Sequence, residues 1–394
     1  MKNSIEYSEN SWLIVSAALI LNLSFGITIA FGVFFPSIIG EFGWPRGITS
    51  IAFSIYTVVY GLTAVLSGWL VERYPVNRII MFGGSLALIG TILSSMTTEI
   101  WHLYLTYGLL VGFGLGTYWV PSILVVSKSF DKSPRLKTAV AIVTTGTGFG
   151  TLIMPPIASF FIINFQWRMA FVLISLILFL MLLPSLLFMT PKNVSKVSSD
   201  STKKEKSDRS FLRDIRYWLL YFGNFGGNIG QMVFLVHLPS FIVDIGFPLT
   251  TASAVVGAAG VGTILGRLAF GNQLKINIEN ILVVSLLIQG AMVSLLIMIN
   301  SLYIFILFGF LWGFLWGIRV FAFPIILRSY FGLASFGLAY GVVNTAYGFA
   351  GLIGPPFVGY AYDITGSYFI GFAFSGLMFL AGSISILISS KSKS

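Results

Sequence analysis

The sequence predicts an all-α membrane protein whose twelve transmembrane helices form two six-helix pseudo-repeat bundles. Three observations predict this class. Of the 394 residues, 56% are hydrophobic and only 9% are charged, whereas an ordinary soluble domain carries about 25% charged residues. Twelve apolar stretches are each long enough to cross a bilayer, for which about 20 residues suffice. A short motif recurs at an offset of 200 residues, close to half the chain length.

The composition also excludes several classes of protein. So few charges could not cover the surface of a soluble globule, which excludes a soluble enzyme, a nucleic-acid-binding protein and a disordered chain. The sequence has no cysteine and two histidines, so we expect no disulfide, no metal site and no cofactor. The predicted spans carry no pair of carboxylates and no nucleophile beside a base, so we do not expect an enzyme.

The twelve stretches follow one another with short connections, except at one point. The first is not a signal peptide, because it follows the acidic Glu6 and Glu9 and further spans continue directly after it. The segment 190–215 is polar, basic and rich in serine, and we interpret it as a flexible linker between bundles at 1–189 and 216–394. The predicted spans are 12–38, 46–70, 77–97, 101–128, 135–163, 167–189, 216–243, 250–272, 278–299, 302–328, 336–361 and 366–389.

The basic residues predict which way the chain crosses the membrane. Of the 23 Lys and Arg, Arg267 and Arg319 lie inside predicted spans and Arg46 and Arg168 lie on one face, while all the others lie on the face that carries both termini and the linker. Loops rich in Lys and Arg stay in the cytoplasm. We therefore expect a multi-pass protein of the cell membrane with both termini in the cytoplasm. The net charge of +10 is then a topology signal that also attracts anionic lipids of the bilayer, not a sign of nucleic acid.

The repeated motif indicates that the two halves are related. Residues 145–156 read TGTGFGTLIMPP and residues 345–356 read TAYGFAGLIGPP, with seven of twelve positions identical. Two six-helix halves of the same orientation form a parallel repeat. In such proteins the binding site lies between the halves near the bilayer midplane, and rocking of the halves exposes it to each side in turn.

One loop carries a family motif. Residues 68–78 read GWLVERYPVNR and resemble the G-x-x-x-D-R-x-G-x-R loop of the major facilitator superfamily, with Glu in place of Asp. The resemblance implies the major facilitator fold. It also implies a conformational latch made by Gly68, Glu72, Arg73 and Arg78, in which Gly68 lets two helices approach closely.

Longer segments narrow the resemblance. Residues 128–148 resemble the helix 4–5 segment of the monocarboxylate transporter family, and residues 236–247 and 354–368 resemble its bacterial members and the related oxalate/formate antiporters. This implies a secondary transporter that moves a small monocarboxylate, such as lactate or pyruvate, by alternating access. A proton is the candidate co-substrate, and we expect a functional monomer.

Arg267 is the first candidate binding residue. An ionised side chain inside a span costs at least about 2.5–3.5 kcal/mol, which makes it a functional candidate, and a guanidinium binds a carboxylate with two parallel hydrogen bonds. The family resemblance implies that it holds the substrate carboxylate. The alternative is an arginine that extends to the cytoplasmic surface. Thr263, one turn earlier on the same face, either binds substrate or bonds its own backbone.

Arg319 lies in the predicted span 302–328 and offers a second cation. With Arg267 it suggests an alternative function, a carboxylate exchanger of the oxalate/formate type. Arg319 could instead extend to the cytoplasm or bind a lipid headgroup. Tyr347 stands where those antiporters carry a lysine, which favours a monocarboxylate.

The remaining candidates are polar side chains within spans, each with packing as the alternative. Tyr118 matches an aromatic residue that lines the cavity in the family, Asn228 and Asn344 could bond the substrate, and His237 could carry the coupled proton because histidine titrates near neutral pH. A non-transporting membrane sensor is a remote alternative. It would need a docking domain, and the longest polar segment is the linker.

Overall fold

The chain is helical throughout the part that the computed structural model describes, residues 9–71, 73–130, 135–189, 209–269 and 277–392. Ten helical stretches there are long and apolar enough to cross a membrane. The helices are α1 (Glu9–Leu23), α2 (Phe25–Phe42), α3 (Arg46–Leu70), α4 (Val76–Ser94), α5 (Ile100–Leu103), the π-helical η1 (Tyr104–Val111), α6 (Gly112–Gly116), α7 (Trp119–Ser129), α8 (Leu136–Phe188), η3 (Ser210–Arg213), α10 (Ile215–Asp244), α11 (Leu249–Ala269), α12 (Ile278–Leu295), η4 (Leu296–Met298), α13 (Leu302–Thr365) and α14 (Phe369–Lys391).

Two of these helices each consist of two segments joined at one non-helical residue. In α8 the joint is Gln166, with φ of 67°, between the predicted spans 135–163 and 167–189. In α13 it is Gly332, with φ of 71°, between the predicted spans 302–328 and 336–361. A glycine adopts this left-handed conformation without steric cost. At each joint, the two predicted spans are thus connected by a single non-helical residue and not by a loop. Residues 190–208 of the predicted linker lie outside the described ranges.

The predicted span 101–128 is interrupted in the structure. It begins as α5, becomes the π-helix η1, and breaks again at Thr117 and Tyr118 before α7. Glycines at 112 and 116 lie against the backbone of Tyr56 and Tyr60 on α3. Close approach of this kind requires glycine, which is also the weakest helix former after proline. The hydrophobic pattern alone gave no sign of these interruptions.

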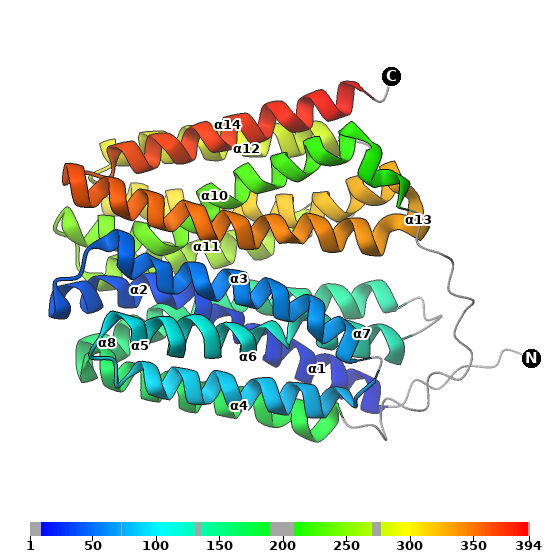
Figure 1. Ribbon diagram of the computed structural model, residues 1–394, viewed down its shortest axis with the longest axis horizontal. Coiled ribbons are helices and arrows are strands. Elements are labelled where there is room, and N and C mark those ends of the chain that lie inside the picture. Colours follow the sequence, from blue (N-terminus) through cyan, green and yellow to red (C-terminus); the bar gives the residue numbers. More distant parts are fainter. Residues whose placement is uncertain (1–8, 72, 131–134, 190–208, 270–276, 393–394) are drawn as a thin grey trace, which may run out of the picture.

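The helices form two bundles, each with its own hydrophobic core (Figure 1). The first bundle contains α1–α8 and the second contains α10–α14. Among the described residues, a small set of side chains packs on the core of the opposite bundle. Met232 and Val236 of α10, Leu249 of α11 and Tyr347 of α13 pack on the first core, and Phe25 and Ile29 of α2 pack on the second. The molecule can therefore be described as two separately packed bodies.

Glycines line the contact between the two bundles, where α3 packs on α13, α11 on α8 and α10 on α2. On α8, Gly148 lies against Ile264 and Gly260 of α11. On α13, Gly348 lies against the backbone of α3 at Thr57 and Val58. Small residues let membrane helices approach closely, so the bundles touch along smooth surfaces.

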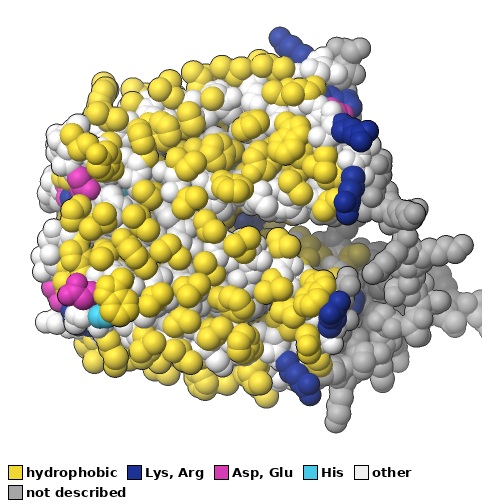
Figure 2. Space-filling model, viewed as in Figure 1, with side chains coloured by type: hydrophobic (Ala, Val, Ile, Leu, Met, Phe, Trp, Pro, Cys, Tyr) yellow, Lys and Arg dark blue, Asp and Glu magenta, His cyan; other side chains and the backbone are white. Residues whose placement is uncertain are grey.

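Charged side chains gather at the two ends of the molecule, and apolar side chains cover the middle (Figure 2). Helix α1 begins and helix α14 ends at the end with the Lys and Arg side chains (Figure 1), which we call the basic end. The acidic end carries Glu41, Glu99, Asp244 and Asp363 at or near helix ends. This distribution is that of a protein whose middle lies in lipid.

Replacing Gly260 with alanine tests the glycine contacts. A Cβ atom at Gly260 would meet backbone atoms of Thr151 and Leu152 on α8, so we expect Gly260→Ala to destabilise the protein by about 1–3 kcal/mol. Gly61 of α3 faces open space, and Gly61→Ala should be neutral or stabilising because alanine favours helix. Thermal unfolding of both purified variants measures the difference, and equal unfolding temperatures would contradict it.

Candidate functional site

Arg267 connects the two bundles through a neutral partner. Its guanidinium extends from the last turn of α11 and its Nη1 donates a hydrogen bond to the backbone carbonyl of Thr144 on α8. Tyr340 of α13 lies near it. Its Nε atom is buried without a hydrogen-bond partner, and no carboxylate of the described residues pairs with it. The site thus presents a cation that lacks an anion.

Arg319 is buried inside the second bundle, with 3% of its surface exposed. Its Nη2 donates to the amide oxygens of Gln231 and Asn228 on α10, whereas Nη1 has no partner among the described residues. The missing side chain of Gly227 leaves the room that the guanidinium occupies. Asn228 is thus a neighbour of Arg319 and not of Arg267.

Arg267 of α11 and Arg319 of α13 lie on different sides of helix α13. Gly317 lies against the backbone of Arg267, which places this side of α13 on α11. Arg319, two positions later, is about 200° further around the helix and contacts α10 instead. In this conformation the structure does not bring the two guanidinium groups together.

Two other predicted site residues lie inside their own bundles. The hydroxyl of Tyr118 is buried, lies toward Gly84 of α4 and has no hydrogen-bond partner among the described residues. The hydroxyl of Thr263 donates to the carbonyl oxygens of Ala259, at 2.8 Å, and Gly313, at 3.2 Å. The structure brings neither hydroxyl to the guanidinium of Arg267.

Asn344 and Tyr347 do lie between the bundles, on one face of α13 with Tyr340, because the three are spaced by four and three residues. Asn344 is exposed and its amide donates to the carbonyl of Tyr340 at 2.9 Å. The ring of Tyr347 lies 6.3 Å from that of Tyr60 on α3. This face of α13 therefore extends from Tyr340, which lies near Arg267, to the contact between the rings of Tyr347 and Tyr60 across the two bundles.

His237 is fully buried near the acidic end of α10. Its Nε2 lies 2.8 Å from the carbonyl oxygen of Pro355. Because a carbonyl only accepts hydrogen bonds, Nε2 carries the hydrogen, and Nδ1 is left without a partner in the described part of the chain. The imidazole ring packs edge-on against Phe35 and lies 5.7 Å from the ring of Tyr368. It does not contact Arg267.

A strong set of polar contacts joins the bundles at the acidic end, and sequence reasoning missed it. Arg46, the first residue of α3, binds both carboxylate oxygens of Asp244 on α10, at 2.7 and 2.9 Å. Its guanidinium also donates to the hydroxyl of Tyr368 and lies 3.8 Å from the centre of the Tyr362 ring. The backbone N–H groups of residues 46 and 47 donate to Asp363, each at 2.8 Å. We call Arg46, Asp244, Asp363 and Tyr368 the acidic-end clasp.

The first bundle contains a similar pair that stays within it. Glu41, at the end of α2, accepts hydrogen bonds from Arg168 at 2.6 Å and Trp167 at 2.5 Å. At the offset of the repeated motif, position 368 carries a tyrosine where position 168 carries an arginine. Because position 368 carries no cation, Asp244 pairs with Arg46 of the opposite bundle. The sequence does contain a signal for the acidic-end clasp, because Arg46, Asp244 and Asp363 all lie at ends of predicted spans on the same side of the membrane.

The predicted latch is described only in part. Gly68 lies against Val120 of α7, and the guanidinium of Arg73 lies 3.9 Å from the ring centre of Trp69. Glu72, the acid of the motif, lies outside the described residues. Arg78 makes no ion pair within them.

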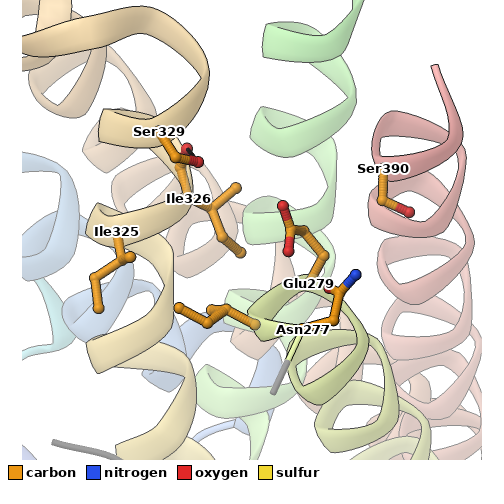
Figure 3. A pocket seen from close by; sticks show the side chains of 7 residues that line it. Asn277, Glu279, Ile325, Ile326, Ser329 and Ser390 are labelled. Atoms are coloured by element: carbon orange, nitrogen blue, oxygen red, sulfur yellow. Dashed lines mark hydrogen bonds between the residues drawn. The ribbon is translucent and has the colours of Figure 1, made fainter. Parts of the chain in front are cut away.

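One cavity, of about 330 Å³, lies at the basic end of the second bundle, away from Arg267 (Figure 3). It lies between the start of α12, the middle of α13 and the end of α14, and it contains none of the predicted site residues. The described residues contain no group of three His, Cys, Asp or Glu side chains that could hold a metal ion. The lining residues are Asn277, Ile278, Glu279, Ile325, Ile326, Ser329 and Ser390.

Comparison with known proteins identifies the class to which this arrangement belongs. The family model "Major Facilitator Superfamily" matches residues 17–318, and the chain belongs to this superfamily of membrane transporters. It is related to monocarboxylate transporters. It is 26% identical to monocarboxylate transporter 13 of Rattus norvegicus over 388 residues, which cover 94% of this chain and 87% of that protein. It is 27% identical to monocarboxylate transporter 11 of Homo sapiens over 394 residues, with 94% and 81% covered.

The fold is shared with a solved transporter structure. This is a bacterial homologue of the human lysosomal transporter Spinster, in an inward-facing and unoccupied conformation. It matches with a TM-score of 0.74 and 16% sequence identity, and the match covers 98% of this chain and 96% of that one. The relatives are transporters and not enzymes, so the chain is a transport protein.

Breaking the acidic-end clasp should open that end. Charge-assisted hydrogen bonds contribute about 1.5–3 kcal/mol each, so we expect Arg46→Gln to raise the population of the open state about tenfold or more. The chain has no cysteine, and Ser240, buried one turn before Asp244, can be changed to cysteine as a reporter. Its labelling by a membrane-impermeant maleimide should speed up accordingly.

Arg168→Gln is the matched control, because its ion pair lies within one bundle. It should leave the labelling rate of Ser240→Cys unchanged. Equal rates in the two variants would show that the Arg46 contacts do not close this end.

Proposed function

We propose that the protein is a secondary transporter that moves a small monocarboxylate across the cell membrane by alternating access, coupled to a proton. It would act as a monomer of twelve transmembrane helices, with bundles 1–189 and 216–394 joined by the cytoplasmic linker 190–215. The basic end and both termini would face the cytoplasm. The observation that carries the proposal is Arg267, a cation between the bundles whose hydrogen-bond partner is a backbone carbonyl.

A carboxylate is the natural ligand for this arginine. It offers a full negative charge and two acceptor oxygens that fit the guanidinium fork, whereas the carbonyl of Thr144 offers a dipole and one oxygen. Asn344 is exposed on the adjoining face of α13 and can bond the same ligand. A bound anion would exchange the contact between Arg267 and α8 for a contact with substrate, and so change the energy of the interface between the bundles.

The glycine contacts support a pseudo-repeat and a rocking motion. Gly148 and Gly348, at equivalent positions of the repeated motif, each face the opposite bundle. With separate cores and smooth glycine contacts, each bundle can move as a body. A ligand drives such motion only through its different affinity for the two states.

The closed acidic end supports an inward-facing state. The acidic-end clasp joins the bundles there, while at the other end Asn344 is exposed and Figure 2 shows a hollow between the bundles. The related solved structure is itself described as inward-facing. Opening toward the outside would require the clasp to break and the basic end to close.

His237 is the proposed proton carrier. Its Nδ1 is the open position on a ring buried beside Tyr368, so a proton arriving there would place a positive charge beneath the clasp, close to the cation Arg46. Repulsion between the two cations would favour release of the clasp, which links protonation to outward opening.

Carboxylate exchange of the oxalate/formate type is the second candidate. The observation that favours it is the free Nη1 of buried Arg319, which could bind a second carboxylate if Gln231 and Asn228 rearrange. Counterflow into vesicles loaded with oxalate separates the two functions. Exchange requires internal substrate and is damaged by Arg319→Gln, whereas proton-coupled uptake requires no internal substrate.

Replacing Arg267 tests the binding site. We expect Arg267→Gln to abolish uptake of labelled lactate and pyruvate into proteoliposomes under an imposed pH gradient, because the ligand loses its counter-charge. Arg328→Gln, an exposed arginine at the basic end, is the control and should retain uptake. Normal uptake by Arg267→Gln would refute the site.

The two histidines test the coupling. His237→Gln should remove the stimulation of uptake by an acidic exterior, since glutamine keeps the hydrogen bond to Pro355 but cannot gain a proton. His102, bonded to Thr98 at the acidic end, is the other histidine, and His102→Gln should respond to pH as the unmodified protein does. Full pH stimulation in His237→Gln would place the proton path elsewhere.

A further inference from the structure

The aromatic contact between the bundles bears on the kind of carboxylate that the site accepts, and the inference rests on the proposed function. Tyr60 of α3 and Tyr347 of α13 face each other with ring centres 6.3 Å apart and ring planes at 55°. Tyr60 continues into a row of rings, at 5.8 Å from Tyr56 and 6.0 Å from Phe25. The wall between the bundles at this depth is therefore a continuous aromatic surface.

One hydroxyl in this row is buried without a hydrogen-bond partner among the described residues. The hydroxyl of Tyr56 bonds to that of Thr28 at 2.6 Å, and the hydroxyl of Tyr107 donates to the Thr28 carbonyl at 3.4 Å. The hydroxyl of Tyr347 is buried and bonds to none of the described residues. Leaving a buried hydroxyl unpaired is unfavourable, so this group is available to a ligand that carries an acceptor.

The positions along α13 give the length of the site. Tyr340, which lies near Arg267, and Tyr347 are seven residues apart on one face, which corresponds to about 10 Å along the helix. Asn344 stands between them. An acid of two or three carbons is shorter than one helical turn, about 5.4 Å. It could not contact both the arginine and the pair Tyr60–Tyr347.

The charge of the site decides what kind of tail fits. The described Asp and Glu residues lie at helix ends or beyond them, while Arg267 lies between the bundles and Arg319 lies within the second bundle. A ligand with a cationic tail would be repelled by these arginines and would find no carboxylate. A neutral, flat tail can instead pack on the tyrosine rings, which favour offset or tilted contact with another ring.

We propose that Tyr60 and Tyr347 form a specificity site for the tail of the substrate, and that the preferred substrates are monocarboxylates with a planar aromatic tail. The carboxylate lies on Arg267, a short linker passes Asn344, and the ring packs against the two tyrosine rings. The hydroxyl of Tyr347 donates to an acceptor on that ring. Because the tyrosines come from opposite bundles, the tail occupies the seam that must rearrange during transport.

The test is a competition series with the intact protein in proteoliposomes, in which unlabelled acids inhibit uptake of labelled lactate. The acids are lactate, pyruvate, benzoate, phenylacetate, 3-phenylpropionate and 4-hydroxyphenylacetate. We expect the three aryl acids that carry a linker between carboxylate and ring to inhibit at concentrations about tenfold lower than unlabelled lactate, with 4-hydroxyphenylacetate among the strongest. Aryl acids no better than lactate would overturn the inference and leave the proposed function intact, whereas absence of any carboxylate uptake would overturn the proposed function.

Substitutions of Tyr347 test whether this residue causes the preference for aryl acids over lactate. Tyr347→Leu should lower the ratio of aryl-acid to lactate affinity about tenfold, and Tyr347→Phe should keep the preference for rings but lose the advantage of 4-hydroxyphenylacetate over phenylacetate. Tyr360→Leu, an exposed tyrosine on the same helix, is the control and should leave the ratio unchanged. Thermal unfolding confirms that each variant is folded, and an unchanged ratio in folded Tyr347→Leu or Tyr347→Phe contradicts the assignment.

Discussion

An arginine inside a membrane needs a partner, and Arg267 has a neutral one. Its hydrogen bond to the backbone carbonyl of Thr144 joins α11 to α8 and therefore joins the two bundles. A dipole stabilises a buried cation far less than a carboxylate does. The contact is strong enough to hold the arginine between the bundles, yet an anion can replace it. The proposed binding, rocking and selectivity all depend on this one exchangeable contact.

The acidic end and the middle of the molecule are held together by different chemistry. At the acidic end, Arg46 is paired with Asp244 and surrounded by aromatic rings, and Asp363 holds the start of α3. In the middle, glycines on α8 and α13 let helices of the two bundles approach each other closely. A structure of this kind favours discrete states, because an ion pair either forms or breaks while the smooth seam permits movement.

Much of the fold could be predicted from the sequence, because hydrophobic length and the distribution of Lys and Arg are local properties. The joints at Gln166 and Gly332 fall between predicted spans for this reason. The residues of the candidate site were harder to predict. Arg267 was found because a lone charge in a span is conspicuous, but the inward direction of Tyr118 depends on packing within the bundle. The role of Arg46 depends on residues about 200 and 320 positions away, which no single stretch of sequence reveals.

Alternating access can be measured by distances across both ends. The chain has no cysteine, so spin labels can be attached to Ser129→Cys with Ser329→Cys at the basic end, and to Thr98→Cys with Thr365→Cys at the acidic end. Lactate and phenylacetate, added in parallel at concentrations that raise the unfolding temperature, should shorten the first distance and lengthen the second. If a carboxylate binds and neither distance changes, the bundles do not rock around Arg267 and the account is wrong.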